Sequence, residues 1–564
     1  MFQENLKHRQ VTLYGIVHQF PVGVIKRLDS SWAPVFRKLI FEKIDERRYA
    51  GLYSTVKSRP NFPVNIWVAL EIIKGMFDYT DQELLEQFHF NLLTARAVGQ
   101  DNLGEVTLSE RTLYYNRERL LEYESRTGRN LLEEEFKAIT DEALAKLSLN
   151  AKTQRMDSSF VGSFIKQMSR LELIAKVLQN FYRDLPEAEQ ARWKYLLSAY
   201  IEDEAEHIAY QLKRVEVEEH LAKLGILLFE LHQTYAGDTE ISSSKSYQHV
   251  SRVLLEQFNI TASAEETTVE LKPSGEISPA SLQNPADDTA TFRRKDGESY
   301  KGALFNVTET CAPENKVQLL TDISVYPNMA ADDAIAVERV PQIKERTGLE
   351  ELIVDGNYSG ENSEKACQKE TINLIPTAVK GRKLSLDQVS LSEFHFDGNV
   401  IATCPEGHSP IAQIHKPAKG GRHLVRFARE YCDGCLRREN CLVRCRKHFY
   451  SLIYTNRQVL LSRRRQQLGE EAYRTKCLLR PAVEGTISQF KRLMHHGKLR
   501  VRGINRVRNS IILMAIGINF GRLLAYSLGN RLGLAVLLSI SILLLMCLAL
   551  EWSKRSEIFA FNLS

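Results

Sequence analysis

Apolar residues follow two different spacings along this chain. In three segments they recur every three or four positions, which is the spacing of an amphipathic helix. These segments are residues 113–121, 174–181 and 221–231. Elsewhere, short runs that are apolar or alternating predict strands. These runs are residues 154–161, 303–310, 317–326, 349–354 and 371–379. The two spacings together predict an α/β fold, with helical regions that interrupt a core containing a sheet.

Changes in pattern and composition divide the chain into seven segments. They are a helical N-terminal domain (1–150), the first part of an α/β core (151–164 and 284–395), a helical insertion (165–260), a linker rich in Ser, Thr and Pro (261–283), a Cys-rich insertion (396–448), the C-terminal helices of the core (449–528) and a hydrophobic tail (529–564). At 564 residues the chain is long enough to bury several hydrophobic cores.

Charge is distributed unevenly, although the total is ordinary. The chain has 75 basic and 70 acidic residues, a net charge of +5. Residues 444–508 contain 17 Lys and Arg but only three acids, Glu470, Glu471 and Glu484. A surplus this one-sided favours contact with a polyanion over an ordinary solvated face. The N-terminus is polar and lacks the features of a signal peptide, so we expect a cytoplasmic protein.

The most informative motif lies inside this basic segment. Arg480, Glu484 and Lys491 are spaced so that one helix would present all three on the same face. A carboxylate between two cations suits a site where the acid holds a metal and the cations hold phosphates. The spacing resembles the Tyr-x2-Arg-x3-Glu-x6-Lys motif of bacterial insertion-sequence transposases with an Asp-Asp-Glu (DDE) triad. Cys477 stands where that motif has Tyr.

Two further acids have the local settings of the same family. Asp157 lies in a strand-like segment and is followed by Ser158, and the family's first Asp is found in an Asp-Ser/Thr context. Asp355 ends an apolar run and begins Asp355-Gly-Asn-Tyr-Ser-Gly360, which resembles the Asp-Gly-x-Tyr-x-Gly context of the family's second Asp. For either residue alone, a turn or capping role is the simpler interpretation. The three acids in this order favour a catalytic site.

The resemblance implies an RNase H-like core with Asp157, Asp355 and Glu484 as catalytic residues. These acids would hold Mg2+ or Mn2+, because carboxylate oxygens suit those ions. The implied activity is cleavage at the ends of an insertion sequence and transfer of those ends into target DNA, by a homo-oligomer bound to double-stranded DNA. The expected DNA-binding residues are Arg480, Lys491, Arg492, Arg502, Arg506 and Arg508. The N-terminal domain, residues 1–150, is also expected to bind DNA. The helix after Ser109 carries basic and aromatic residues that suit either DNA contact or simple packing: Arg111, Tyr114, Tyr115, Arg117 and Arg119.

Other classes of protein remain open at this point. A metal-dependent nuclease that cuts without joining would need the same triad. A catalytically inactive, transposase-derived DNA-binding protein would keep the basic surface. Intact acids at all three positions argue against the second alternative, whereas Cys477 leaves it open.

Cysteines concentrate in the segment before Glu484. Of nine in the chain, five lie between residues 404 and 445, which favours a reducing compartment and a metal site over disulfides. Cys432-x2-Cys435, with Cys404 and Cys441, could form a closed structural zinc site. His408 and Cys445 are alternative fourth ligands, and a set of reduced cysteines without metal is the simpler interpretation. Related transposases show a similar Cys pattern here.

The tail contains an uncharged apolar run, residues 532–550, flanked by Arg531 and by Trp552. Its length and flanks meet the criteria for a membrane-spanning helix, so the tail could bring part of the protein to the inner membrane. A helix buried against the core, or a dispensable extension, is the alternative for an enzyme that acts on DNA.

Overall fold

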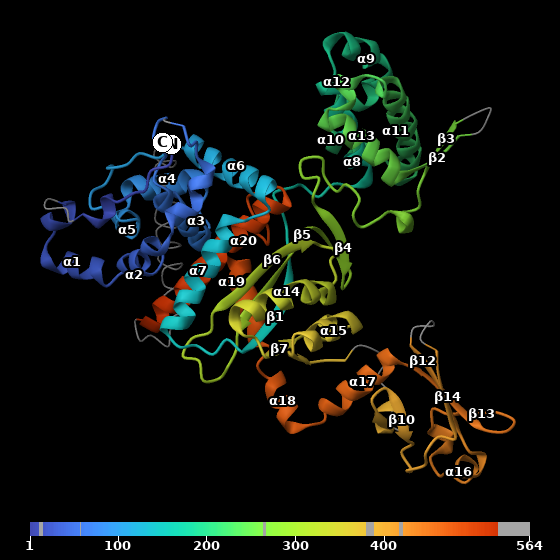
Figure 1. The fold of residues 1–564 in the computed structure, drawn as a ribbon. Coiled ribbons are helices and arrows are strands. Elements are labelled where there is room, and N and C mark those ends of the chain that lie inside the picture. The colour runs from blue at the N-terminus through green and yellow to red at the C-terminus, as the bar shows by residue number, and fades with distance from the viewer. Residues whose placement is uncertain (11–14, 57, 263–266, 380–387, 417–420, 528–564) are drawn as a thin grey trace, which may run out of the picture.

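The computed structural model describes residues 1–564 except 11–14, 57, 263–266, 380–387, 417–420 and 528–564 (Figure 1). The fold is mixed α/β and is organised around a central six-stranded sheet. Its strands are β1 (Thr153–Val161), β4 (Thr291–Lys295), β5 (Glu298–Thr310), β6 (Leu320–Pro327), β7 (Glu351–Val354) and β8 (Asn373–Pro376). The main order is β4-β5-β1-β7-β8, and β6 also pairs with β5.

Strand direction changes at β1, in the middle of the sheet. β5 is antiparallel to both β1 and β6, whereas β7 is parallel to β1 and to β8. The turn between β5 and β6 forms the hairpin that the alternating pattern predicts. The parallel strands need longer crossovers. Between β7 and β8 the crossover is α15 (Glu361–Lys369).

Helices cover both faces of the sheet. One face packs against α15 and α14 (Asp332–Thr347), with Met156 of β1 in the same buried cluster as Ala336 and Val340 of α14. The other face packs against α19 (Ala482–Arg492) and α20 (Ile504–Ser527). There the rings of Phe305 and Phe490 lie 5.2 Å apart. Because side chains alternate along a strand, Arg155 and Asp157 point to the α19 face and Met156 to the α14 face.

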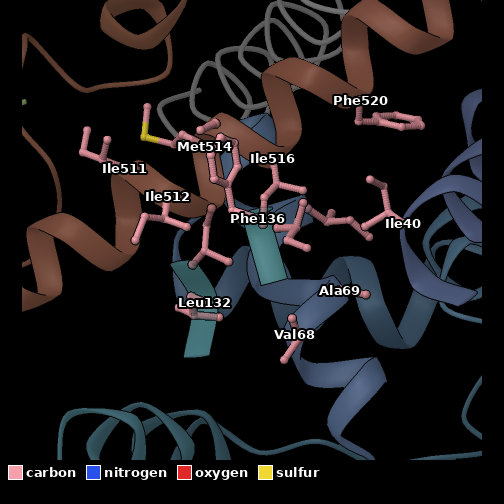
Figure 2. Close-up of a cluster of buried hydrophobic side chains, with 14 of the residues drawn as sticks. Ile40, Val68, Ala69, Leu132, Phe136, Ile511, Ile512, Met514, Ile516 and Phe520 are labelled. Atoms are coloured by element: carbon pink, nitrogen blue, oxygen red, sulfur yellow. The ribbon is translucent and has the colours of Figure 1, made fainter. Parts of the chain in front are cut away.

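The N-terminal region is helical and packs on α20. Its elements are η1 (Lys7–Arg9), η2 (Ile16–Gln19), α1 (Val22–Asp29), α2 (Trp32–Leu39), η3 (Phe41–Lys43), η4 (Glu46–Leu52), α3 (Val64–Phe77), α4 (Asp81–Phe90), α5 (Leu92–Ala97), α6 (Glu110–Thr127) and α7 (Leu131–Lys146). Figure 2 shows side chains of α20, such as Ile512 and Ile516, among Val68, Leu132 and Phe136 of these helices. The boundary at residue 150 therefore does not separate two hydrophobic cores.

The helical insertion has a core of its own. It consists of α8 (Arg170–Asp184), α9 (Glu187–Ile201), α10 (Ala205–Gln211), α11 (Arg214–Tyr235), α12 (Thr239–Ser242) and α13 (Lys245–Gln257). The segment expected to be a partly ordered linker, residues 261–283, contains some regular structure. It includes β3 (Thr267–Leu271), which pairs with β2 (Phe258–Ala262), and η5 (Ser274–Glu276). Its end is packed, because Arg252 donates to the backbone carbonyl of Ala280 and Leu282 is fully buried.

The Cys-rich insertion forms a small β-rich lobe. It contains η7 (Leu391–Glu393), β9 (His395–Asp397), β10 (Val400–Thr403), β11 (Ala412–Lys416), β12 (Arg422–Phe427), α16 (Arg429–Asp433), η9 (Arg438–Asn440), β13 (Arg444–Cys445) and β14 (Tyr450–Thr455). The lobe extends beyond the expected boundary at residue 448, because β14 pairs with both β12 and β13. In Figure 1 this lobe and the helical insertion project from the central sheet. The chain then continues through α17 (Asn456–Gln467) and α18 (Glu471–Cys477) to α19.

Among the described residues one helix, α20, is long and apolar enough to cross a membrane. However, 72% of its most apolar window is buried inside the protein, where it forms the core described above. The apolar run at residues 532–550 lies outside the described residues.

Candidate active site

Two of the predicted acids lie beside one another in the middle of the sheet. The parallel register pairs Met156 of β1 with Val354, the last residue of β7, so Asp157 and Asp355 each follow a paired position. Asp157 lies on the α19 face of β1, and Asp355, one residue beyond the end of β7, is close enough to raise the pKa of Asp157. The parallel pairing of β1 with β7 thus joins two acids that are far apart in the sequence.

Asp157 is buried among charges that do not balance. Its side chain is only 12% exposed. Burial raises its pKa to about 6, Arg480 and the Ser158 amide lower it, and nearby Asp355 and Asp332 raise it again. This part of the site therefore carries more negative charge than its own cation can neutralise.

The turn after β7 holds Asp355 in a fixed position. Its carboxylate caps the short helix η6 (Gly356–Tyr358) by accepting from the Asn357 amide. Gly356 has no room for a side chain, because a Cβ there would lie 2.5 Å from the Ala378 carbonyl oxygen. Tyr358 is buried and donates to Asn306 of β5 at 2.7 Å. The Asp-Gly-x-Tyr segment is thus anchored to the sheet by Tyr358, and Gly356 permits the close approach of the Ala378 carbonyl.

The third acid lies on a helix that begins later than predicted. α19 starts at Ala482, so Glu484 is in its first turn and Lys491 is two turns further along the same side. Arg480 is not on this helix, and the prediction that all three share one helix is wrong for Arg480. Pro481 is the reason, because proline disfavours helical backbone in the residue before it. Cys477 ends α18 and packs against a small cluster that includes Tyr473.

Arg480 occupies the space between two of the acids. Its Nη2 donates to Oδ2 of Asp157 at 2.7 Å, and its Nη1 donates to Oε1 of Glu484 at 3.1 Å. The Glu484 side chain is 65% exposed, so the site opens to solvent on that side. Within the described parts of the chain, no group of three or more His, Cys, Asp or Glu side chains is arranged to hold a metal ion. All three acids could share one only after the Arg480 guanidinium moved.

A fourth acid adjoins the site and was not predicted. Asp332 is the first residue of α14 and accepts a hydrogen bond from the Ser158 hydroxyl at 2.8 Å. It lies across the sheet from α19, yet it is close enough to raise the pKa of Asp157. Its only signal in the sequence is an acidic pair at a helix start, a pattern that also occurs at ordinary helix N-termini.

The predicted DNA-binding residues fall into two groups. Lys491 and Arg492 are exposed at the end of α19. The other group follows α19 in the sequence and makes contacts within the protein. Its members are Arg502, Arg506 and Arg508. Arg506 and Arg508 form ion pairs with Glu118 and Glu124 of α6, and Arg502 donates to the Phe164 carbonyl while its guanidinium lies over the Phe164 ring.

The basic and aromatic residues of helix α6 also fall into two groups, one buried in contacts within the protein and one exposed. Arg117 is mostly buried and pairs with Glu71 and Asp81, so it joins α6 to α3 and α4. Arg111 donates to the Tyr115 hydroxyl, and both residues are exposed. Arg117 therefore has a packing role, whereas Arg111 and Tyr115 face solvent.

Four cysteines of the insertion surround one small cavity. Cys404, Cys432, Cys435 and Cys441 line a space of about 30 Å³. The pKa of Cys432 is raised to about 11, mainly by burial and also by the other three thiols nearby. The side chains are not arranged as a closed metal site as they stand. Of the alternative ligands, His408 also lines the cavity and stacks on Tyr431, whereas Cys445 is exposed on β13.

Comparison with protein families gives one match. Residues 403–524 match the family described as "Transposase DDE domain". The match supports a DDE-type transposase, and it includes the Cys-rich lobe from residue 403 onward, Arg480 and Glu484. It does not extend to Asp157 or Asp355, so their place in the site rests on the strand pairing. Comparisons with curated proteins and with solved structures give no match.

Proposed function

We propose that this protein is a DNA transposase that cuts DNA at the ends of an insertion sequence and joins those ends to target DNA. One observation carries the proposal. Asp157 on β1 and Asp355, one residue beyond β7, follow a pair of adjacent positions on parallel strands, and Arg480 links Asp157 to Glu484 on a helix of the matched transposase domain. The proximity of these side chains supports a triad of Asp157, Asp355 and Glu484.

The proposed core is RNase H-like. Its support is the run of antiparallel strands β6-β5-β1 followed by the parallel strands β7 and β8. The acids come from the central strand, from the end of its parallel neighbour and from a helix on one face. The helical insertion and the Cys-rich lobe would then be additions to this core.

Asp157, Asp355 and Glu484 would hold Mg2+ or Mn2+. Their oxygens are the hard ligands that these ions prefer, and burial together with nearby Asp355 and Asp332 raises the pKa of Asp157, which a bound cation would lower. When bound, such ions would supply an activated hydroxyl and stabilise the departing 3′ oxygen. Arg480 would leave the acids and contact a DNA phosphate. Lys491 and Arg492, exposed on α19, would hold the DNA backbone nearby.

The direct test uses DNA that flanks the coding region. Duplexes from each flank should be cut with Mg2+ at matching inverted repeats, and a pre-cut end with a free 3′-hydroxyl should be joined to a supercoiled plasmid. Duplexes of scrambled sequence are the control. Cleavage without joining would indicate a nuclease, and binding without cleavage would indicate an inactive DNA-binding protein.

We also propose that the Cys-rich lobe binds structural zinc through Cys404, Cys432, Cys435 and Cys441. Thiolates are preferred zinc ligands, and all four thiols face one cavity. Elemental analysis of purified protein should give about one zinc per chain. Cys432→Ser should lose the metal and Cys445→Ser should keep it. Zinc-free protein from zinc-supplemented cultures would contradict this site.

The proposed reaction places the protein in the cytoplasm, on DNA, as a homo-oligomer that brings two element ends together. The tail at 529–564 is proposed to be dispensable for this chemistry. A variant that ends after Asn530 should still cut and join DNA and should be more soluble. Loss of cleavage in folded, truncated protein would assign the tail to the core.

A further inference from the structure

A buried carboxylate lies on the α19 face of the sheet, close to the proposed site but separate from it. Glu309 of β5 is fully buried. Its Oε1 accepts from Nε of Arg155 at 2.7 Å, and its Oε2 accepts from the Thr486 hydroxyl at 2.7 Å and from Nη1 of Arg522 at 2.8 Å. Strands β1 and β5 and helices α19 and α20 thus meet at this carboxylate.

Two members of this network reach further along the chain. Nη1 of Arg155 donates to the carbonyl oxygen of Leu479 at 2.7 Å, and Leu479 directly precedes Arg480. Nη2 of Arg522 donates to the Thr486 hydroxyl at 2.5 Å. The network therefore holds the segment that carries Arg480 and Glu484 at two points, one before Arg480 and one after Glu484.

Two residues of the Glu309 network lie close in sequence to acids of the proposed site. Arg155 lies two residues before Asp157 and points to the same face of β1. Thr486 lies two residues after Glu484 on α19. Displacement of either contact would therefore change the position of Glu484 relative to Asp157.

The network supplies the Glu309 carboxylate with both positive charge and hydrogen bonds. Burial opposes ionisation of Glu309, but Arg522 and Arg155 outweigh it and lower its pKa. Both carboxylate oxygens have partners. A buried ion pair is a weak source of stability compared with apolar packing, whereas its directed bonds fix relative positions closely.

We propose that Glu309 is a positioning residue, which through Arg155, Thr486 and Arg522 sets the location of Arg480 and Glu484 relative to Asp157. This inference rests on the proposed function, because it assigns the network to the geometry of that site. Glu309 itself would touch no reacting atom and would act through the backbone of residues 479–486.

The test uses Thr486→Val, which removes one hydrogen bond to Glu309 at nearly constant volume. Hydrogen exchange of the α19 amides and Mn2+ binding followed by electron paramagnetic resonance are measured on the full chain without DNA. The Mg2+ concentration for half-maximal cleavage is measured separately. Thr486→Ser retains the hydroxyl and is the rescue variant. Asp322→Asn breaks another buried ion pair, to Arg339 on the α14 face, and is the matched control.

Thr486→Val should speed amide exchange in residues 482–492 and weaken Mn2+ binding by roughly tenfold, as loss of a supporting contact does around metal ligands. Thr486→Ser should restore both, and Asp322→Asn should lower thermal stability without changing either. Wild-type exchange and Mn2+ affinity in Thr486→Val would overturn the proposal. If the wild-type protein neither binds Mn2+ nor cleaves DNA, the proposed function fails, and α19 exchange still decides whether the network positions this helix.

Discussion

Two clusters of arginine and carboxylate lie on the same face of the central sheet, and they are built in opposite ways. In the first cluster two arginines and a hydroxyl donate hydrogen bonds to one acid, Glu309, which is fully buried. In the second cluster one arginine pairs with two acids, Asp157 and Glu484, and Asp355 and Asp332 lie close to Asp157. The first cluster lowers the pKa of its acid and the second leaves the pKa of its acid raised.

The difference separates a structural network from a site that lacks positive charge. Burial of an ion is tolerated when partners satisfy it, as they do for Glu309. Raised carboxylate pKa values that arise from burial and like charges are typical of functional sites. Cations from outside the chain would relieve the Asp157 cluster, whereas the Glu309 cluster needs none.

The largest expected effect comes from removing the acids of the Asp157 cluster. Asp157→Asn, Asp355→Asn and Glu484→Gln should each reduce cleavage and joining by roughly a thousandfold, the size expected when a metal ligand in the reaction is lost. The fold and DNA binding should persist. Glu471→Gln, an exposed acid in the same basic segment, should leave both rates unchanged. Near-normal Mg2+-dependent cleavage by any one of the three variants would remove that residue from the site.

Removing the carboxylate of the Glu309 cluster should lower the stability of the protein. Glu309→Ala leaves two buried arginines without their carboxylate, so the free energy of unfolding should fall by about 3–5 kcal/mol. Asp157→Asn should instead be neutral or stabilising at neutral pH, because it relieves repulsion in the empty site. Denaturant unfolding of both variants measures the contrast. Equal losses would show that the two clusters do not differ in the way described.

The pH dependence of stability should also distinguish the two clusters. The pKa of Asp157 is about 6 in the folded protein, above its unfolded value of about 4. Folded protein therefore binds this proton more tightly, and the stability it contributes is complete below about pH 4 and is lost as the pH rises through 6. With EDTA present, the wild type should lose about 2 kcal/mol relative to Asp157→Asn between pH 4 and pH 7. A constant difference across this range would contradict the raised pKa.

The smallest expected effect is on DNA binding, and it comes from removing the exposed cations at the end of α19. Lys491→Ala and Arg492→Ala should each lower the salt dependence of DNA binding by about one unit of slope, as loss of one phosphate contact does. Arg506→Ala and Arg508→Ala should have less effect on that slope, because both side chains pair with α6. Binding isotherms at several salt concentrations measure this. The reverse ranking would place DNA along α6 and α20 and away from α19.

Local pattern predicted much of the fold. The strand-like runs at 154–161, 303–310 and 349–354 correspond to β1, β5 and β7, and the helical stripes correspond to α6, α8 and α11. Periodicity works here because each element must present one apolar face to a core. The pattern was less informative at residues 261–283, where β3 is short and mostly exposed, and at β14, whose place in the Cys-rich lobe depends on pairing with β12.

The sequence by itself determined the local settings of the acids, the basic character of residues 444–508 and the clustering of cysteines. These are properties of neighbours along the chain. Only the tertiary structure decided that Asp157 and Asp355 are adjacent, that Pro481 excludes Arg480 from α19 so that its guanidinium lies between Asp157 and Glu484, and that Glu309 is tied to α19. The physical reason is that these contacts join residues more than a hundred positions apart or depend on a helix boundary. The partner of a charged side chain is set by packing and strand register, which local spacing does not encode.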